Sequence, residues 1–167
     1  LSPHPHTLLL QKSETALEKS ESMPHHQLIG DGTWGLVANG VSFNYVRDAV
    51  SDLEIGDKVS ILKLGFSWPM PKDLCTRFLK DVDKVLVVEE LEPVNEKDLK
   101  AIAQENGIIT PIKGKGDSGL SRLYEYDPGL VRQSIAAYLG LDYTAPERTD
   151  LSDLPALPGR PPNLCAG

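Results

Sequence analysis

Short apolar segments alternate with amphipathic segments of helical length from Trp34 to Gly140, and this alternation restricts the chain to one class of fold. Strands are predicted at 34–38, 57–64, 84–88 and 108–112, with helices between them. Strands that alternate with helices form right-handed βαβ units around a mainly parallel sheet. Residues 85–88 (VLVV) are apolar on both faces, which is typical of a central strand covered above and below.

The predicted helices each carry one apolar face. Residues 41–53 form the first helix, with Tyr45, Val46, Ala49, Val50 and Leu53 on its buried side. The second helix follows a Gly/Pro loop at 65–71 and buries Leu74, Cys75, Phe78, Leu79 and Val82. These patterns predict helices that pack on a sheet through one side only.

Capping residues define the last two helices. Asn95 is the predicted N-cap of a helix that carries Leu99, Ile102 and Ala103, and Gly107 is its natural C′ residue. Asp127 and Pro128 supply the N-cap and first-turn proline of a helix at 128–139, which stops at Gly140. Pro111 indicates that the strand at 108–112 lies at an edge.

Three regions follow from this pattern. Residues 1–25 are predicted to be an N-terminal linker and a polar helix that Thr7 caps. Residues 26–140 are the α/β domain, a three-layer α/β/α sandwich with a mostly parallel sheet of four to five strands, including a short edge strand at 26–29. Residues 141–167 are a proline-rich linker. Since the chain starts at Leu1 and ends without a polar tail, we expect it to be a segment of a longer protein.

Charge and hydropathy exclude two kinds of partner. The net charge is −7 and no basic stripe is visible, which disfavours a nucleic-acid surface. No apolar run approaches the roughly 20 residues that span a bilayer, so no membrane contact is expected and the protein is predicted to be cytoplasmic. Cys75 and Cys165 lie far apart and predict neither a disulfide framework nor a metal site.

Two glycine motifs resemble cofactor motifs but are interpreted as turns. Residues 114–119 (GKGDSG) match G-x-G-x-x-G, yet no helix start follows directly, so we predict a loop. Residues 30–32 (GDG) resemble the start of a thiamine diphosphate motif, but the chain contains no Asn-Asn pair. A tight turn explains this triplet.

Polar clusters give no catalytic assignment either. Glu89, Glu90 and Glu92 follow the third predicted strand, where α/β domains place ligands, and could bind a cation or act as an acid–base pair. A solvated loop or a domain-contact patch is favoured. The histidines at 4, 6, 25 and 26 are expected to be exposed or disordered, and Cys75 is expected to be a small buried hydrophobe. No catalytic, cofactor-binding or metal-binding residue is assigned.

Several strings resemble one enzyme family. They are 38–49 (ANGVSFNYVRDA), 62–71 (LKLGFSWPMP), 84–93 (KVLVVEELEP), 112–116 (IKGKG) and 160–167 (RPPNLCAG). In this order they are similar to the alpha subunit of indolepyruvate ferredoxin oxidoreductase, one of the 2-oxoacid:ferredoxin oxidoreductases. The resemblance runs from about Leu28 to Gly167.

The resemblance implies a parent enzyme and a place within it. The family carries out oxidative decarboxylation of an aryl pyruvate with coenzyme A, using thiamine diphosphate, Mg²⁺ and 4Fe–4S clusters, and passes electrons to ferredoxin. This chain would be the middle, transketolase C-terminal-like domain, with the thiamine-binding domains on either side and a beta subunit as a further partner. Cys165 receives no ligand role, since the family's second cysteine is missing.

The resemblance therefore predicts a structural or assembly domain with no cofactor of its own. Two alternatives stay open. One is a free-standing ligand-binding module whose pocket lies near Asn39–Gly40, Phe66–Pro69 and Glu89–Glu92. The other is a docking surface for coenzyme A or for the beta subunit.

Overall fold

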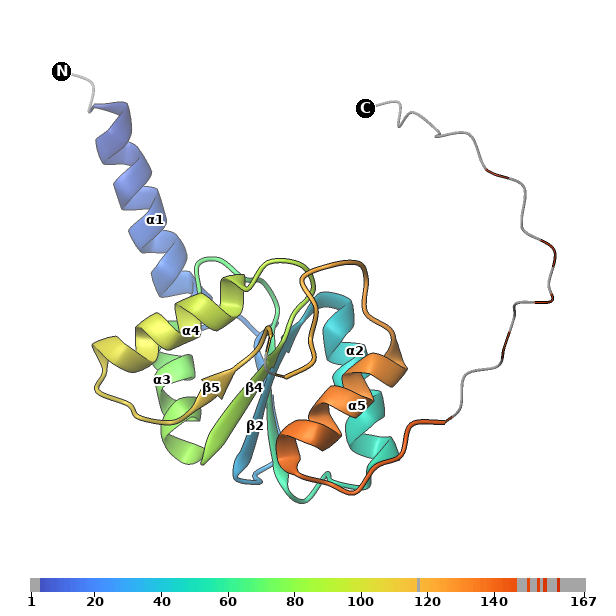
Figure 1. Ribbon diagram of the computed structural model, residues 1–167. Helices are drawn as coiled ribbons and strands as arrows, with labels where there is room; N and C mark the ends of the chain where they lie inside the picture. The colour runs from blue at the N-terminus through green and yellow to red at the C-terminus, as the bar shows by residue number, and fades with distance from the viewer. Residues whose placement is uncertain are drawn as a thin grey trace.

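The computed structural model describes residues 4–116, 118–146, 150, 153, 155 and 159. Helices and strands alternate along these residues (Figure 1). The helices are α1 (Pro5–Glu21), α2 (Gly40–Asp52), α3 (Lys72–Asp81), α4 (Val94–Glu105) and α5 (Pro128–Leu139). The strands are β1 (Gln27–Ile29), β2 (Trp34–Asn39), β3 (Val59–Leu64), β4 (Lys84–Val88) and β5 (Ile112–Lys113).

The five strands form one sheet in the order β1-β3-β2-β4-β5. β2, β3, β4 and β5 are parallel, and β1 pairs antiparallel with β3 at the edge. The prediction of a mostly parallel sheet with a short antiparallel edge strand is confirmed. β4 lies between β2 and β5, so its apolar run occupies an interior position as expected.

Helices cover the sheet on both faces, which gives three layers (Figure 1). Leu36, Ala38 and Leu86 pack with α2 and α5 in one core cluster. Val37, Val85 and Val87 pack with α3 and α4 in the other. Successive strand residues point to opposite faces, so an uninterrupted apolar strand supplies both cores at once.

The helix ends confirm three of the predicted cap positions. Asp127 accepts a hydrogen bond from the Leu130 N–H at 2.9 Å, and Gly140 has a left-handed φ of 72°. Gly107 also has a positive φ, of 64°, just after α4. These are sites where a side-chain acceptor or a residue without Cβ relieves the helix terminus.

Two predicted boundaries are wrong. α1 begins at Pro5 with His4 as its N-cap, because the His4 imidazole accepts the His6 N–H, so Thr7 lies inside the helix. The fourth predicted strand, 108–112, is reduced to β5 at Ile112–Lys113. The segment before it is still tied to the sheet, since the Val85 N–H donates to the Pro111 carbonyl at 2.8 Å.

No helix in the described part of the chain is long and apolar enough to cross a membrane. Most of the predicted linker at 141–167 lies outside the described residues.

Candidate functional site

The carboxyl ends of the parallel strands gather three of the sequence segments singled out above. Asn39–Gly40 ends β2, Phe66–Pro69 follows β3, and Glu89–Glu92 follows β4. Because these strands are parallel, the three segments meet at one edge of the sheet. This edge is where open α/β sheets bind their ligands.

Glu89 is buried here, with 4% of its surface exposed, so the solvated interpretation is wrong for this residue. Its carboxylate accepts the N–H groups of Asn95, at 2.8 Å, and Glu96, at 2.9 Å. These are the second and third residues of α4, whose N–H groups an N-cap side chain would normally satisfy. Burial raises the pKa of Glu89, and the two N–H groups oppose that rise.

Asn95 therefore does not cap α4. It lies inside the helix, and its Oδ1 atom is buried without a hydrogen-bond partner among the described residues. The N-cap position belongs to Pro93, which offers no side-chain acceptor. A carboxylate from the end of the preceding strand takes over this role.

Lys115 joins this edge to the glycine-rich segment. Its ammonium donates to the Glu89 carbonyl, to the Tyr126 hydroxyl and to the Ser121 carbonyl, the last at 3.2 Å. Its backbone N–H donates to Glu96 Oε2 at 2.9 Å. Burial lowers the pKa of Lys115 and raises that of Tyr126 to about 12.

The other two acids hold the same segment, residues 114–126, which we name the cover loop. Glu90 Oε1 accepts the Tyr126 N–H at 2.9 Å, and Glu92 forms an ion pair with Arg122. The Glu92 pair is exposed, and side-chain hydrogen bonding from Arg122 lowers the pKa of Glu92. All three acids thus contact the cover loop directly or through Lys115.

The G-x-G-x-x-G match lies in the cover loop. Gly116 and Gly119 have φ values of 82° and 80°, and Lys115 forms an isolated bridge with Leu120. No helix begins between these residues and Pro128, so the loop interpretation is confirmed. Asp117, within the match, lies outside the described residues.

The remaining candidates behave as packing groups. Cys75 is fully buried, and burial raises its pKa to about 12, which confirms the hydrophobe interpretation. His26 is half-buried rather than exposed: its ring meets Phe66 edge-on at 4.4 Å, and its Nδ1 accepts the Gly65 N–H. Among the described residues, no three His, Cys, Asp or Glu side chains come together as a metal site would require.

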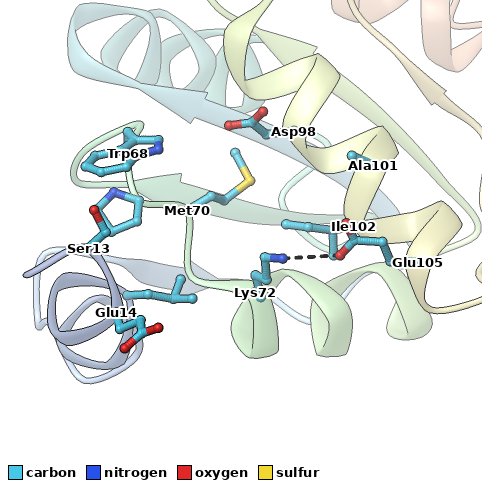
Figure 2. A pocket seen from close by; sticks show the side chains of 11 residues that line it. Ser13, Glu14, Trp68, Met70, Lys72, Asp98, Ala101, Ile102 and Glu105 are labelled. Carbon is cyan, nitrogen blue, oxygen red and sulfur yellow. Dashed lines mark hydrogen bonds and ion pairs between the residues drawn. The ribbon is translucent and has the colours of Figure 1, made fainter. Parts of the chain in front are cut away.

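A cavity of about 380 Å³ opens beside the carboxyl edge, between α1, the loop after β3, and α4 (Figure 2). Trp68 and Met70 form its apolar wall together with Leu17, Pro69, Ala101 and Ile102. Glu14, Asp98 and the Lys72–Glu105 ion pair, 3.2 Å apart, surround it. Figure 2 shows Trp68 and Met70 from the loop facing Ile102 and Asp98 on α4.

α1 forms one side of this cavity because Glu21 anchors it. The Glu21 carboxylate accepts the N–H groups of Asp73, at 2.8 Å, and Leu74, at 3.1 Å, at the start of α3. The pocket hypothesised from the sequence is formed only in part, since Trp68 and Pro69 line the cavity whereas 39–40 and 89–92 do not. Sequence reasoning missed Glu21, Lys115 and Met70.

The sequence of this chain is similar to segments of known proteins. No protein-family model matches the chain. A Methanothermobacter thermautotrophicus protein, indolepyruvate oxidoreductase subunit IorA, is 39% identical over 137 residues, which is 82% of this chain. The corresponding Thermococcus kodakarensis subunit is 36% identical over 167 residues, or 96% of this chain. The chain is homologous to one segment of indolepyruvate oxidoreductase subunit IorA.

That segment is a minor part of the relatives. The chain spans 21% of the length of the Methanothermobacter subunit and 25% of the Thermococcus subunit. The resemblance to the indolepyruvate ferredoxin oxidoreductase alpha subunit is thereby confirmed, and the chain matches one domain-sized piece of it.

Solved structures confirm the fold. One similar structure is a 2-oxoglutarate:ferredoxin oxidoreductase from Magnetococcus marinus, with a TM-score of 0.54 and 18% sequence identity. The superposition covers 81% of this chain and 24% of the chain of that enzyme. Another is a split-gene transketolase, with a TM-score of 0.55 and 19% sequence identity. The superposition covers 71% of this chain and 42% of the transketolase chain. The chain has the transketolase C-terminal-like fold.

Proposed function

We propose that this chain is a non-catalytic scaffold domain of a thiamine diphosphate-dependent indolepyruvate:ferredoxin oxidoreductase. The observation that carries the proposal is that the three acidic side chains after β4 are all engaged in contacts within the domain. Glu89 caps α4, Glu90 holds the Tyr126 N–H and Glu92 pairs with Arg122. The Glu89 carboxylate thus serves α4, while the Glu90 and Glu92 carboxylates hold the cover loop in place. Carboxylates engaged in this way are not available as a metal site or an acid–base pair.

In the parent enzyme the chemistry would belong to other segments. We propose that thiamine diphosphate, Mg²⁺, 4Fe–4S clusters and coenzyme A bind outside this chain, where the 2-oxoacid is decarboxylated oxidatively to an acyl-CoA. Ferredoxin would accept the electrons in the cytoplasm. The homology to a quarter or less of each IorA subunit supports this division.

The scaffold role calls for surfaces that meet neighbouring domains or the beta subunit. Leu8, Leu9 and Leu10 on α1 are 41%, 58% and 52% exposed, and Trp68 is 66% exposed. Figure 1 shows α1 projecting from the three-layer body. Apolar side chains presented in this way favour contact with a further protein surface. The cavity of Figure 2 likewise favours the alternative of a docking module.

Catalysis by the chain alone is tested with a turnover assay. The purified protein is mixed with indolepyruvate, thiamine diphosphate, Mg²⁺, coenzyme A and a viologen dye as electron acceptor. We expect no dye reduction above the protein-free rate, whereas a complete IorA-containing enzyme reduces the dye in the same assay. Indolepyruvate-dependent dye reduction by this chain would overturn the proposal.

Assembly is tested by exchanging segments. This chain replaces the matched quarter of the Thermococcus kodakarensis subunit, and complex formation with the beta subunit is followed by size-exclusion chromatography. We expect the native chimera to assemble, Leu9→Asp and Trp68→Ala chimeras to assemble less, and a Lys58→Ala control to match the native chimera. Equal assembly of all four would count against these surfaces as contacts.

A further inference from the structure

A second and larger cavity, of about 630 Å³, is lined by residues of β4, β5, the cover loop and α5. Among the described residues, it shares no lining residue with the cavity of Figure 2. Its volume falls within the range of about 300–1,000 Å³ that is usual for small-molecule sites.

The charged side chains that line this cavity, among the residues that the structure describes, are of one sign. They are Lys84 and Lys113, with no Asp or Glu among the described lining residues. Among the described residues, the ion pairs involve neither lysine. In a chain with a net charge of −7, a cavity whose described charged lining consists of two cations differs in sign from the chain as a whole. It therefore favours an anionic guest.

Lys84 is held in place without being neutralised. Its ammonium donates to the Tyr138 carbonyl at 3.2 Å and lies 5.2 Å from the Trp34 ring and 5.1 Å from the Tyr138 ring. These contacts fix the position of the cation, and none of them is with a carboxylate. Tyr138 is fixed in turn, because its hydroxyl donates to the Val85 carbonyl at 2.9 Å.

Small polar groups complete the wall. Ser118 and Ser134 line the cavity and are 8% and 4% exposed. Gly119, between them in the wall, has a φ of 80°, a conformation open to glycine and strained for other residues. The Ser118 hydroxyl donates to the Gly114 carbonyl and so fixes this part of the wall. The Ser134 hydroxyl, beside two ammonium groups, suits an oxyanion that accepts several hydrogen bonds. The apolar remainder, Pro111, Leu130 and the Tyr138 ring, suits an organic body attached to it.

We propose that this cavity is a binding site for an organic phosphate monoester. The phosphate lies between Lys84, Lys113 and Ser134, and its organic substituent packs against Tyr138 and Leu130. Ser118 and Gly119, from the end of the glycine-rich match, thereby gain a role that differs from dinucleotide binding by a helix N-terminus: they form part of the wall of a lysine-lined cavity.

The test uses phenyl phosphate, benzoate and inorganic phosphate as probes on the full chain. Each is titrated while the amide resonances of Ser118, Gly119, Ser134 and Tyr138 are followed by NMR. We expect phenyl phosphate to shift these resonances with a lower Kd than either other probe, and the Kd to rise with added salt because charge attraction is screened. Shifts elsewhere, or none at millimolar probe, would overturn the site.

Two variants and a control make the result specific. Lys113→Ala removes an exposed cation and should raise the Kd of phenyl phosphate about tenfold, as loss of one charge-assisted bond implies. Ala137→Phe, at an exposed position that lines the cavity, should block binding by filling it. Lys97→Ala, exposed on α4, should leave the Kd unchanged. Benzoate binding as tight as phenyl phosphate would refute the phosphate assignment.

Discussion

Lys115 is the residue through which the cover loop and the end of β4 depend on each other. It is half-buried, yet its ammonium is satisfied by two carbonyls and a phenol rather than by a salt bridge. Burial of a charge is tolerated where hydrogen bonds replace its hydration. Without the ammonium, the Tyr126 hydroxyl and the Glu89 carbonyl lose a shared donor.

Lys115→Met should therefore lower the free energy of unfolding by about 1–3 kcal/mol, the usual range for leaving buried polar groups without a partner. Urea denaturation followed by circular dichroism measures this. Lys58→Met, at an exposed position, is the matched control and should change the free energy of unfolding by less than about 0.5 kcal/mol. Equal effects of the two substitutions would show that the Lys115 contacts contribute nothing.

Glu89 predicts a pH dependence of stability. Its pKa is raised from the ordinary value of 4.5, with burial as the largest cause. The folded chain therefore binds more protons than the unfolded chain between the two pKa values, and stability contributed by this group falls as pH rises through that window. Glu89→Gln removes this dependence.

The wild-type chain should thus lose stability relative to Glu89→Gln as the pH rises above 4.5, the ordinary pKa of this carboxyl. Urea midpoints of both proteins at several pH values measure the difference. Glu125→Gln, at an exposed position, should give no such trend. A difference that grows in favour of wild type with pH would mean that the Asn95 and Glu96 N–H groups outweigh burial.

At the scale of elements, α4 shows where sequence patterns fail. Asn95 stands where a local rule places a cap, but the N-cap position lies two residues earlier, at Pro93, and the helix takes its acceptor from Glu89. The position of Glu89 depends on the end of β4 and on its contact with Lys115, which lies 26 residues further along the chain. Asp127, by contrast, caps its own helix and was predictable because its partner is Leu130.

β5 illustrates the same limit. The apolar run at 108–112 predicts a full strand, yet only Ile112 and Lys113 pair with β4. Ile109 is 95% exposed, so the run does not behave as a core strand. The edge position, which Pro111 indicated, is confirmed. A single sequence gives strand propensity, whereas the length of pairing is set by the neighbouring strand.

α1 gives a prediction for a whole element, since Glu21 joins its C-terminal end to the start of α3. Glu21→Ala removes the acceptor for the Asp73 and Leu74 N–H groups and should lower the free energy of unfolding by about 1 kcal/mol, as loss of a helix cap does. Amide hydrogen exchange within α1 should also become faster. Glu18→Ala, exposed on the same helix, should change neither; unchanged exchange in Glu21→Ala would show that other contacts hold α1.

At the scale of the molecule, the three layers could be predicted from the sequence, whereas the position of the cover loop at the sheet edge could not. Neighbouring strand residues such as Leu36 and Val37 pack into the cores on opposite faces of the sheet. The alternation of strands and helices is therefore enough to predict three layers. The cover loop is polar and carries Gly114, Gly116 and Gly119, which indicate a loop but not its place. Its place depends on hydrogen bonds between distant residues, which no local pattern encodes.

The tight packing of both cores leads to a last prediction, on Cys75. Its thiol is fully buried between α3 and the sheet, and its pKa is raised to about 12, so almost no thiolate exists in the folded state at pH 8. Labelling by a thiol reagent should therefore require the core to open. In a Cys165→Ser background, the labelling rate of Cys75 should follow the equilibrium between folded and open chains.

Phe78→Leu tests that link, because Phe78 is 2% exposed in the same core cluster and its ring lies against Gly35. Loss of ring volume should cost on the order of 1–2 kcal/mol and accelerate Cys75 labelling about tenfold. Trp68→Ala, at a site 66% exposed, should leave the rate unchanged. Rapid labelling of the otherwise native chain would contradict the closed core, since a thiol that reacts without unfolding must already reach solvent.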